Sequence, residues 1–128
     1  MRSIVAGILL VFIGLVLYGC PGETVTDPNQ ITFPPENVSY REHAAPFLAL
    51  SCGQCHGETT AAGGIILTNY SDLFFSRPNL VVPELPDESL LNQVLEQVIG
   101  HPVGNIEFIP QNHVTGMRTW VEEGALNN

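Results

Sequence analysis

The sequence predicts a small all-α domain, and two observations support this fold class. The chain has 128 residues, and its apolar N-terminal stretch has the features of a segment removed on export. The residues that remain after removal are enough for one small core. Apolar residues in the rest of the chain recur at the three- and four-residue spacing of helices with one buried face. We therefore expect three to five helices around a single core.

The first helix is predicted from about Tyr40 into Cys52. Ser39 is a plausible N-cap, and Glu42 three residues later completes a capping box. Pro46 either begins a helix or kinks this one. His43 falls on an exposed turn and is expected to be a surface residue. Three apolar side chains should face the core, namely Phe47, Leu48 and Leu50.

Three further helices are predicted along the chain. A short one covers residues 71–75, a second begins at Asp87 and ends at Gly100, and the last runs from about Asn112 to Glu123, where Gly124 ends it. The core residues expected on the second are Leu90, Leu91, Val94, Leu95 and Val98. Those expected on the last are Val114, Met117, Trp120 and Val121.

The N-terminal segment has the features of an export signal. Residues 1–19 contain a positive start at Met1-Arg2 followed by an apolar run, and Leu17-Tyr18-Gly19-Cys20 resembles the lipobox of bacterial lipoproteins. The resemblance implies that Cys20 is lipidated and becomes the new N-terminus; an uncleaved membrane anchor is the alternative. Residues 20–37 then form a flexible, proline-containing tether, and 38–128 form the domain. Both alternatives place the domain in the bacterial cell envelope, facing the periplasm or exterior.

The chemistry is concentrated in Cys52-Gly53-Gln54-Cys55-His56. Two thiols three residues apart, followed directly by a histidine, are typical of covalent haem attachment, with the histidine as proximal iron ligand. A redox dithiol would need a βαβ context, which the sequence does not suggest. A zinc site would need a second close ligand pair, and none follows. The favoured cofactor is thus one covalent haem c, bound by Cys52, Cys55 and His56.

Charge restricts the possible partners. The chain has four arginines, no lysine and thirteen acidic residues, with a formal net charge of −9. Nucleic acid is therefore an unsuitable partner. A redox protein that docks by charge would present a basic patch, although the acidic surface could serve solubility alone. With Cys20 in the export signal and the other two cysteines on haem, no thiol is left for a disulfide.

Several segments together resemble a known family. The haem motif, Gly63-Gly64-Ile65-Ile66-Leu67, Asp87-Glu88-Ser89-Leu90-Leu91 and the segment from Trp120 to Ala125 occur in the order seen in monohaem cytochrome c domains of bacterial lipoproteins, including the planctomycete type. The resemblance covers residues 38–128. It implies a class I-like cytochrome c fold in which the first and last helices cross, with Trp120 packed where they meet.

The second axial ligand has several candidates. In the family that the chain resembles, this ligand usually lies in a loop before the last helix, where His101-Pro102 stands here. A residue before proline is also held out of helix, as a ligand on a loop should be. Met117 is the alternative, although its place on an apolar helix face is typical of core methionines. His113 near the helix start, or an open position, completes the choices.

These features favour an electron carrier over an enzyme. A haem with histidine on both sides of the iron is closed to other ligands and passes single electrons between redox partners. Two alternatives remain. The chain could be the haem-bearing subunit of a larger oxidoreductase complex, or it could hold a catalytic or gas-sensing haem with an open sixth position.

Overall fold

The computed structural model describes residues 24–101, 106 and 109–128, and within these ranges the chain forms helices and no strand. The expected all-α class is confirmed for this part of the chain. The predicted signal at 1–19 and Cys20 lie outside the described residues. In the same ranges, every helix is too short or too polar to span a membrane.

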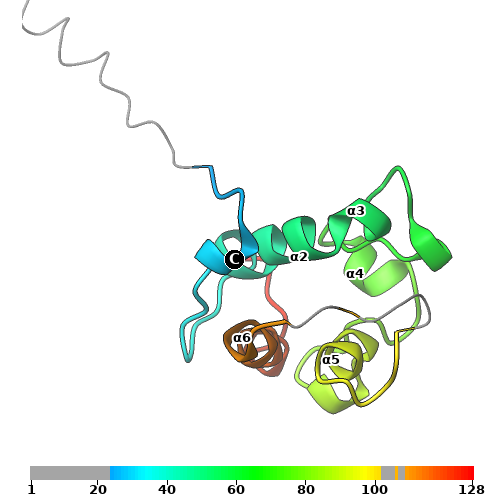
Figure 1. Cartoon of the computed structure of the whole chain (residues 1–128). Helices are drawn as coiled ribbons and strands as arrows, with labels where there is room; N and C mark the ends of the chain where they lie inside the picture. Colours follow the sequence, from blue (N-terminus) through cyan, green and yellow to red (C-terminus); the bar gives the residue numbers. More distant parts are fainter. Residues whose placement is uncertain (1–23, 102–105, 107–108) are drawn as a thin grey trace, which may run out of the picture.

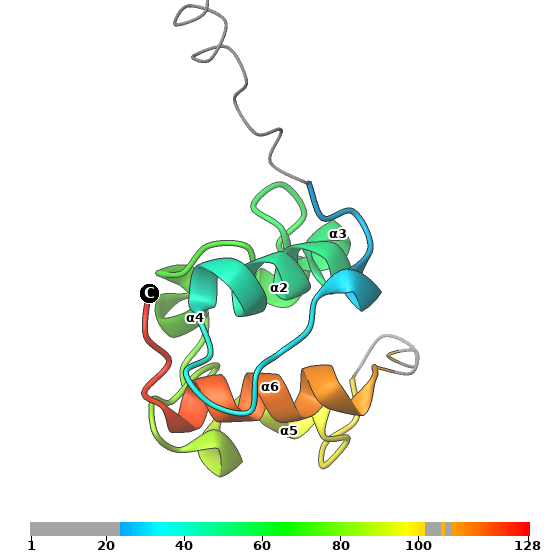
Figure 2. The ribbon, with the colours of Figure 1, turned by 90° about the vertical axis from the view of Figure 1, so that its left-hand side faces the viewer.

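The helices lie in two layers (Figures 1 and 2). The upper layer holds η2 (Tyr40–Ala44), α2 (Ala45–Ser51), α3 (Gly53–His56) and α4 (Asp72–Phe75). The lower layer holds α5 (Leu90–Leu95) and α6 (Gln111–Glu122), and both views place α2 above α6. Three short 3₁₀ turns complete the described part: η1 (Pro28–Gln30) before the first helical segment, η3 (Ala62–Gly64) between α3 and α4, and η4 (Pro86–Glu88) before α5.

The first helical segment begins at the predicted N-cap, Ser39, but the second hydrogen bond of the predicted capping box is replaced by another. The Ser39 hydroxyl accepts from the backbone N–H of Glu42, as expected. The N–H of Ser39 donates to Nδ1 of His43 at 3.0 Å instead of to the Glu42 carboxylate. His43 is therefore a half-buried cap residue and not an exposed one. Pro46 lies in the first turn of α2, just after the π-helical turn η2, where its missing N–H is tolerated.

Two expected core positions are exposed. Leu50 is 37% exposed, because two residues along a helix rotate it about 200° away from buried Leu48. Val98 is 70% exposed, because α5 ends at Leu95 and not at Gly100. Gln97 adopts φ 59°, and the N–H of Val98 returns to the carbonyl of Gln93 at 2.8 Å, which is the hydrogen bond of a Schellman ending.

The last helix follows its prediction closely. Its four expected core residues are buried, and Gly124 ends it with φ 96°, while the N–H of Ala125 returns to the carbonyl of Trp120 at 2.9 Å. Trp120 is fully buried, with its ring centroid 5.6 Å from that of Tyr40 on η2. The tryptophan therefore packs where the first helical segment meets the last helix.

The packed part of the chain begins before residue 38, where the predicted domain starts. Ile31 and Phe33 are buried, and residues 31–38, which we name the strap, pack along α6. The side-chain amide of Asn112 accepts from the N–H of Phe33 and donates to its carbonyl, both at 3.2 Å. The prediction of a flexible tether over 20–37 is therefore wrong for its C-terminal part. Apolar spacing could not reveal the strap, because it is not helical and is held by side chains some 80 positions away in sequence.

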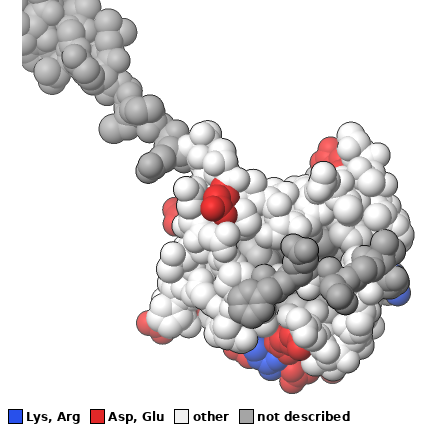
Figure 3. All heavy atoms as spheres, viewed as in Figure 1, with Lys and Arg blue, Asp and Glu red and all other residues white. Residues whose placement is uncertain are grey.

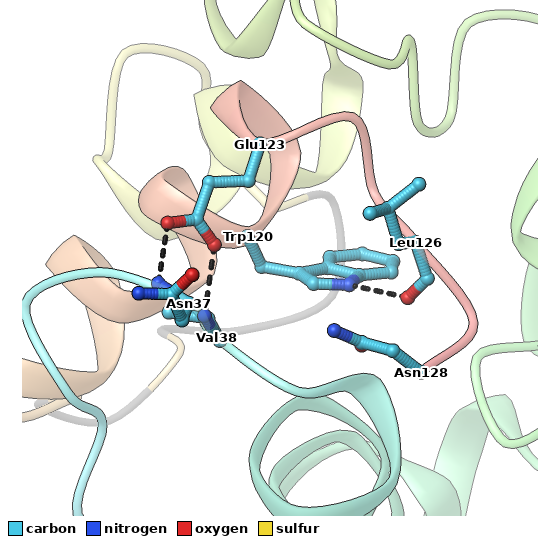
Figure 4. Close-up of a pocket in the computed structure, with 6 residues that line it drawn as sticks. All are labelled: Asn37, Val38, Trp120, Glu123, Leu126 and Asn128. Carbon is cyan, nitrogen blue, oxygen red and sulfur yellow. Dashed lines mark hydrogen bonds between the residues drawn. The ribbon is translucent and has the colours of Figure 1, made fainter.

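The other end of the strap is held by a carboxylate. Glu123 accepts from the N–H groups of Asn37 and Val38 at 2.6 and 2.8 Å (Figure 4). Near the middle, a Cβ added to Gly116 would lie 2.1 Å from Cγ of Phe33. Only glycine lets the strap approach α6 this closely.

Candidate functional site

The cysteine motif forms one compact helical turn. The carbonyl of Cys52, the last residue before α3, accepts from the N–H of Cys55 at 3.1 Å and from that of His56 at 2.8 Å. Two glycines allow this turn to pack tightly. A Cβ on Gly57 would lie 2.5 Å from the carbonyl oxygen of Gly53, and one on Gly53 would lie 3.0 Å from Thr68.

A sharp turn after the motif orients His56. Ala61, Gly63 and Gly64 have φ values of 41°, 64° and 73°, which reverse the chain. The returning segment donates the N–H of Leu67 to the carbonyl of His56 at 2.8 Å. It also places the carbonyl of Ile65 3.3 Å from Nδ1 of His56. A carbonyl can only accept, so Nδ1 carries the proton and Nε2 keeps the lone pair that a metal needs.

The ring of His101 packs against that of His56. The two ring centroids are 5.8 Å apart and the ring planes meet at 84°. Nδ1 of His101 is buried without a hydrogen-bond partner among the described residues. Buried ring nitrogens are normally paired, and Nδ1 of His113 in the core has no partner among the described residues either.

The separation of the two rings fits a shared metal ion. Two metal–nitrogen bonds of about 2 Å each, together with the two ring radii, put the centroids of opposite imidazoles roughly 6 Å apart. The observed 5.8 Å is compatible with this spacing and is also usual for packed rings, as between Phe33 and His43. The motif thiols precede His56 on the same turn, so Cys52 and Cys55 would hold a haem covalently, and His56 and His101 would be the candidates to ligate its iron.

The other proposed ligands have roles elsewhere. Met117 is fully buried in the core. Nε2 of His113 donates to the carbonyl of Ile31 at 2.8 Å, so this residue ties the strap to α6. Nδ1 of His43 accepts from the backbone of Ser39. Of these candidates, His101 is the one whose ring packs against that of His56.

The thiols differ in their surroundings. Burial, and secondarily the neighbouring Cys55, raises the pKa of the Cys52 thiol to about 11, whereas Cys55 is exposed. A redox dithiol needs a first cysteine with a lowered pKa, so this environment is unfavourable for that chemistry.

Within the described ranges, no three His, Cys, Asp or Glu side chains form a metal-binding group.

Two surface hollows lie between the strap and α6, with volumes of about 310 and 410 Å³. The first lies beside Trp120 and Glu123 (Figure 4), and the second beside Phe33 and Gly116. Both belong to the contact between the strap and α6.

One contributor to the site was not predicted from sequence. The carbonyl of Ile65 orients His56, but a backbone acceptor has no residue signature. The glycine pair Gly63-Gly64 was the available signal, because it predicts the tight turn that brings the next residues back to the motif.

Comparison of the chain with protein-family models, with curated proteins and with solved structures found no significant match. The functional assignment therefore rests on the residues and geometry described above.

Proposed function

We propose that this protein is a monohaem c-type cytochrome that carries single electrons between redox partners in the bacterial cell envelope. In this proposal Cys52 and Cys55 bind the haem c covalently, His56 is the proximal iron ligand and His101 the distal one. Lipidated Cys20 anchors the chain to a membrane. The bound haem supplies a reversible one-electron couple of its iron.

The observation that carries the proposal is the packing of the His101 ring against that of His56 beside the cysteine motif. The haem motif alone would leave the sixth position undefined. The second imidazole, on a loop 45 positions later in sequence, is the ligand that we propose for it. This pairing favours electron transfer over a catalytic or gas-sensing haem, because both axial positions are taken by protein.

Each residue of the site has a distinct part in this function. The Ile65 carbonyl holds the proton on Nδ1 of His56, so that the ring presents Nε2 in a fixed orientation. Two imidazoles, in place of imidazole and methionine, favour a lower reduction potential. The close turn around Gly53 and Gly57 keeps the thiols and His56 in register with one another.

The test is whether the haem is covalent and depends on the two cysteines. The full chain is produced in cells with c-type haem attachment machinery and extracted with acid and acetone. We expect the colour to stay with the protein, and the double variant Cys52→Ser, Cys55→Ser to lose it. Cys20→Ser is the matched control and should keep its haem. Colour that passes completely into the acetone would contradict the proposal.

A further inference from the structure

Two of the four histidines lie outside the proposed site, and both pack against one ring of the strap. The ring centroid of Phe33 is 5.8 Å from that of His43 on η2 and 5.8 Å from that of His113 on α6. Phe33 itself is 4% exposed. The strap is therefore held at Phe33 by two imidazoles that belong to different helices.

The hydrogen bonds of both rings require one nitrogen without a proton. Nδ1 of His43 accepts from the N–H of Ser39 at 3.0 Å, so a proton bound there would remove the acceptor of that N–H. Nε2 of His113 donates to the carbonyl of Ile31 at 2.8 Å, so the nitrogen without a proton is Nδ1. This Nδ1 is buried and has no hydrogen-bond partner among the described residues. The docked strap therefore fits two neutral rings.

No carboxylate forms an ion pair with either ring in the part that the structure describes, where the ion pairs are those of Arg118. On the face drawn in Figure 3, the acidic side chains form separate small groups, mainly at its margin. The elements packed around the two rings carry these ionisable residues: Asp27 at the start of η1, Glu36 on the strap, Tyr40, Arg41 and Glu42 on η2, Arg118 and Glu122 on α6, and Glu123 just after it, with none on α2. A proton on either ring would place a positive charge without a counter-ion at a buried or half-buried position, which is unfavourable.

We propose that His43 and His113 form a pH-sensitive latch on the N-terminal part of the strap, residues 31–36. While both rings are neutral, Phe33 stays between them. When Phe33 leaves, the rings reach water and bind protons without an unpaired buried group. Docking therefore weakens as the pH falls, because the released state binds protons that the docked state excludes. Histidine ordinarily changes its charge between about pH 5 and 8, so release is expected in this range.

The latch would change how far the domain reaches from its anchor, and this consequence rests on the proposed lipidation of Cys20. Release adds the six residues 31–36 to the segment between Cys20 and the packed domain. At about 3.5 Å for each extended residue, the reach grows by up to about 20 Å. The domain would then contact redox partners farther from the membrane at acidic pH than at neutral pH.

The test measures hydrogen exchange of the Phe33 N–H by NMR in the full-length holoprotein, at about pH 7.5 and about pH 5. The result is expressed as protection, the ratio of the unfolded-chain rate to the observed rate, which removes the ordinary effect of pH on exchange. The Phe33 N–H is bonded to Asn112, and we expect its protection to fall about tenfold or more at the lower pH. The N–H of Val38 is bonded to Glu123 and not to a histidine. Its protection should fall less than about threefold.

Two conservative variants remove the titration and keep the hydrogen bonds. His43→Asn supplies an amide oxygen that can accept from Ser39 in place of Nδ1, and His113→Gln supplies an amide N–H that can donate to the carbonyl of Ile31 in place of Nε2. The double variant should keep its Phe33 protection within about twofold between the two pH values, because neither amide binds a proton there. Each single variant should show an intermediate fall.

Glu123→Gln is the matched control, because it weakens the other end of the strap and leaves both histidines in place. Its Phe33 protection should be lower than in wild type at both pH values and should fall by the same factor between them. A factor as small as that of the double histidine variant would contradict the latch.

The remaining outcomes separate the latch from the proposed function. Wild-type protection of Phe33 that stays constant or rises at the lower pH, or an equal fall in the double variant, would overturn the latch. An equal fall at the N–H of Leu91, which is bonded to the carbonyl of Leu80 at 3.0 Å, would also overturn it, because the whole domain would then be opening. Haem content is measured separately, and wild-type protein without haem would reject the cytochrome function, whereas the exchange data alone decide the latch.

Discussion

The contact between the strap and α6 and the region around the cysteine motif differ in what holds them together. In the first, Asn112, His113 and Glu123 bind the strap backbone, and Phe33 fills the space left by Gly116. In the second, the backbone of one helical turn and of the returning segment positions His56, whose ring packs against that of His101, and one thiol is exposed. The comparison indicates that α6 and the strap form a frame held by side chains, whereas the motif region presents the candidate ligands.

The largest effect is expected at the site itself. His101→Ala removes one of the two facing imidazoles and leaves the cysteines intact, so haem should remain attached while its sixth position opens. Carbon monoxide should then bind the ferrous protein rapidly, which absorption spectra would detect. Met117→Leu is the matched control, and it should bind carbon monoxide no faster than wild type. Rapid binding by unmodified protein would favour a catalytic or sensing haem.

A substitution in the frame should affect stability and leave the site unchanged. Gly116→Ala would ordinarily strengthen a helix by about 1 kcal/mol. Here its Cβ would meet the Phe33 ring, so we expect a net loss of about 1–3 kcal/mol in the free energy of unfolding. Denaturant titration of the holoprotein measures this loss. Thr115→Ala, at an exposed neighbouring position, should change stability by less than about 0.5 kcal/mol. A stabilised Gly116→Ala protein would mean that the strap does not contact α6 there.

The carboxylate that holds the strap should have a smaller effect. Glu123 binds the N–H groups of Asn37 and Val38 with one carboxylate oxygen each. In Glu123→Gln one of these oxygens becomes an amide NH₂, which cannot accept a hydrogen bond from the N–H group that it faces. We expect a loss of about 1–2 kcal/mol, because these charge-assisted bonds are partly exposed to water. Glu122→Gln is the control, with an effect of a few tenths of a kcal/mol, since its carboxylate makes an exposed pair with Arg118. Equal losses in the two variants would contradict the role given to Glu123.

The smallest effect is expected for Arg118, although it makes three ion pairs. Its partners range from 22% to 81% exposed, and such pairs contribute little in water. The pKa of Arg118 is raised, chiefly by its hydrogen bonds to Glu96 and Asp87, so the residue stays charged at every ordinary pH. Arg118→Gln should cost about 1 kcal/mol or less at low salt. Chemical unfolding with urea should show no difference from wild type in 1 M salt, because ions screen the pairs.

The sequence predicted the helices best where local signals agreed. Ser39 capped its helix, Gly124 ended the last one, and the spacing from Val114 to Val121 gave the buried face correctly. It failed for Val98, because a left-handed Gln97 ended α5 without a glycine to mark the position. The strap was missed because its burial depends on Gly116 and on side chains distant in sequence.

The candidate site shows a similar division. The cysteine motif and His56 follow from local spacing, whereas the pairing of His101 with His56 depends on how the loop after α5 returns to α3.

The ferric absorption spectrum of the holoprotein tests the central claim most directly, because it reports both bound haem and the atoms on its iron. We predict a low-spin spectrum without the long-wavelength band of a sulfur-to-iron transition, unchanged in Met117→Leu and altered in His101→Ala. A sulfur band that disappears in Met117→Leu and survives in His101→Ala would contradict the pairing of His56 with His101.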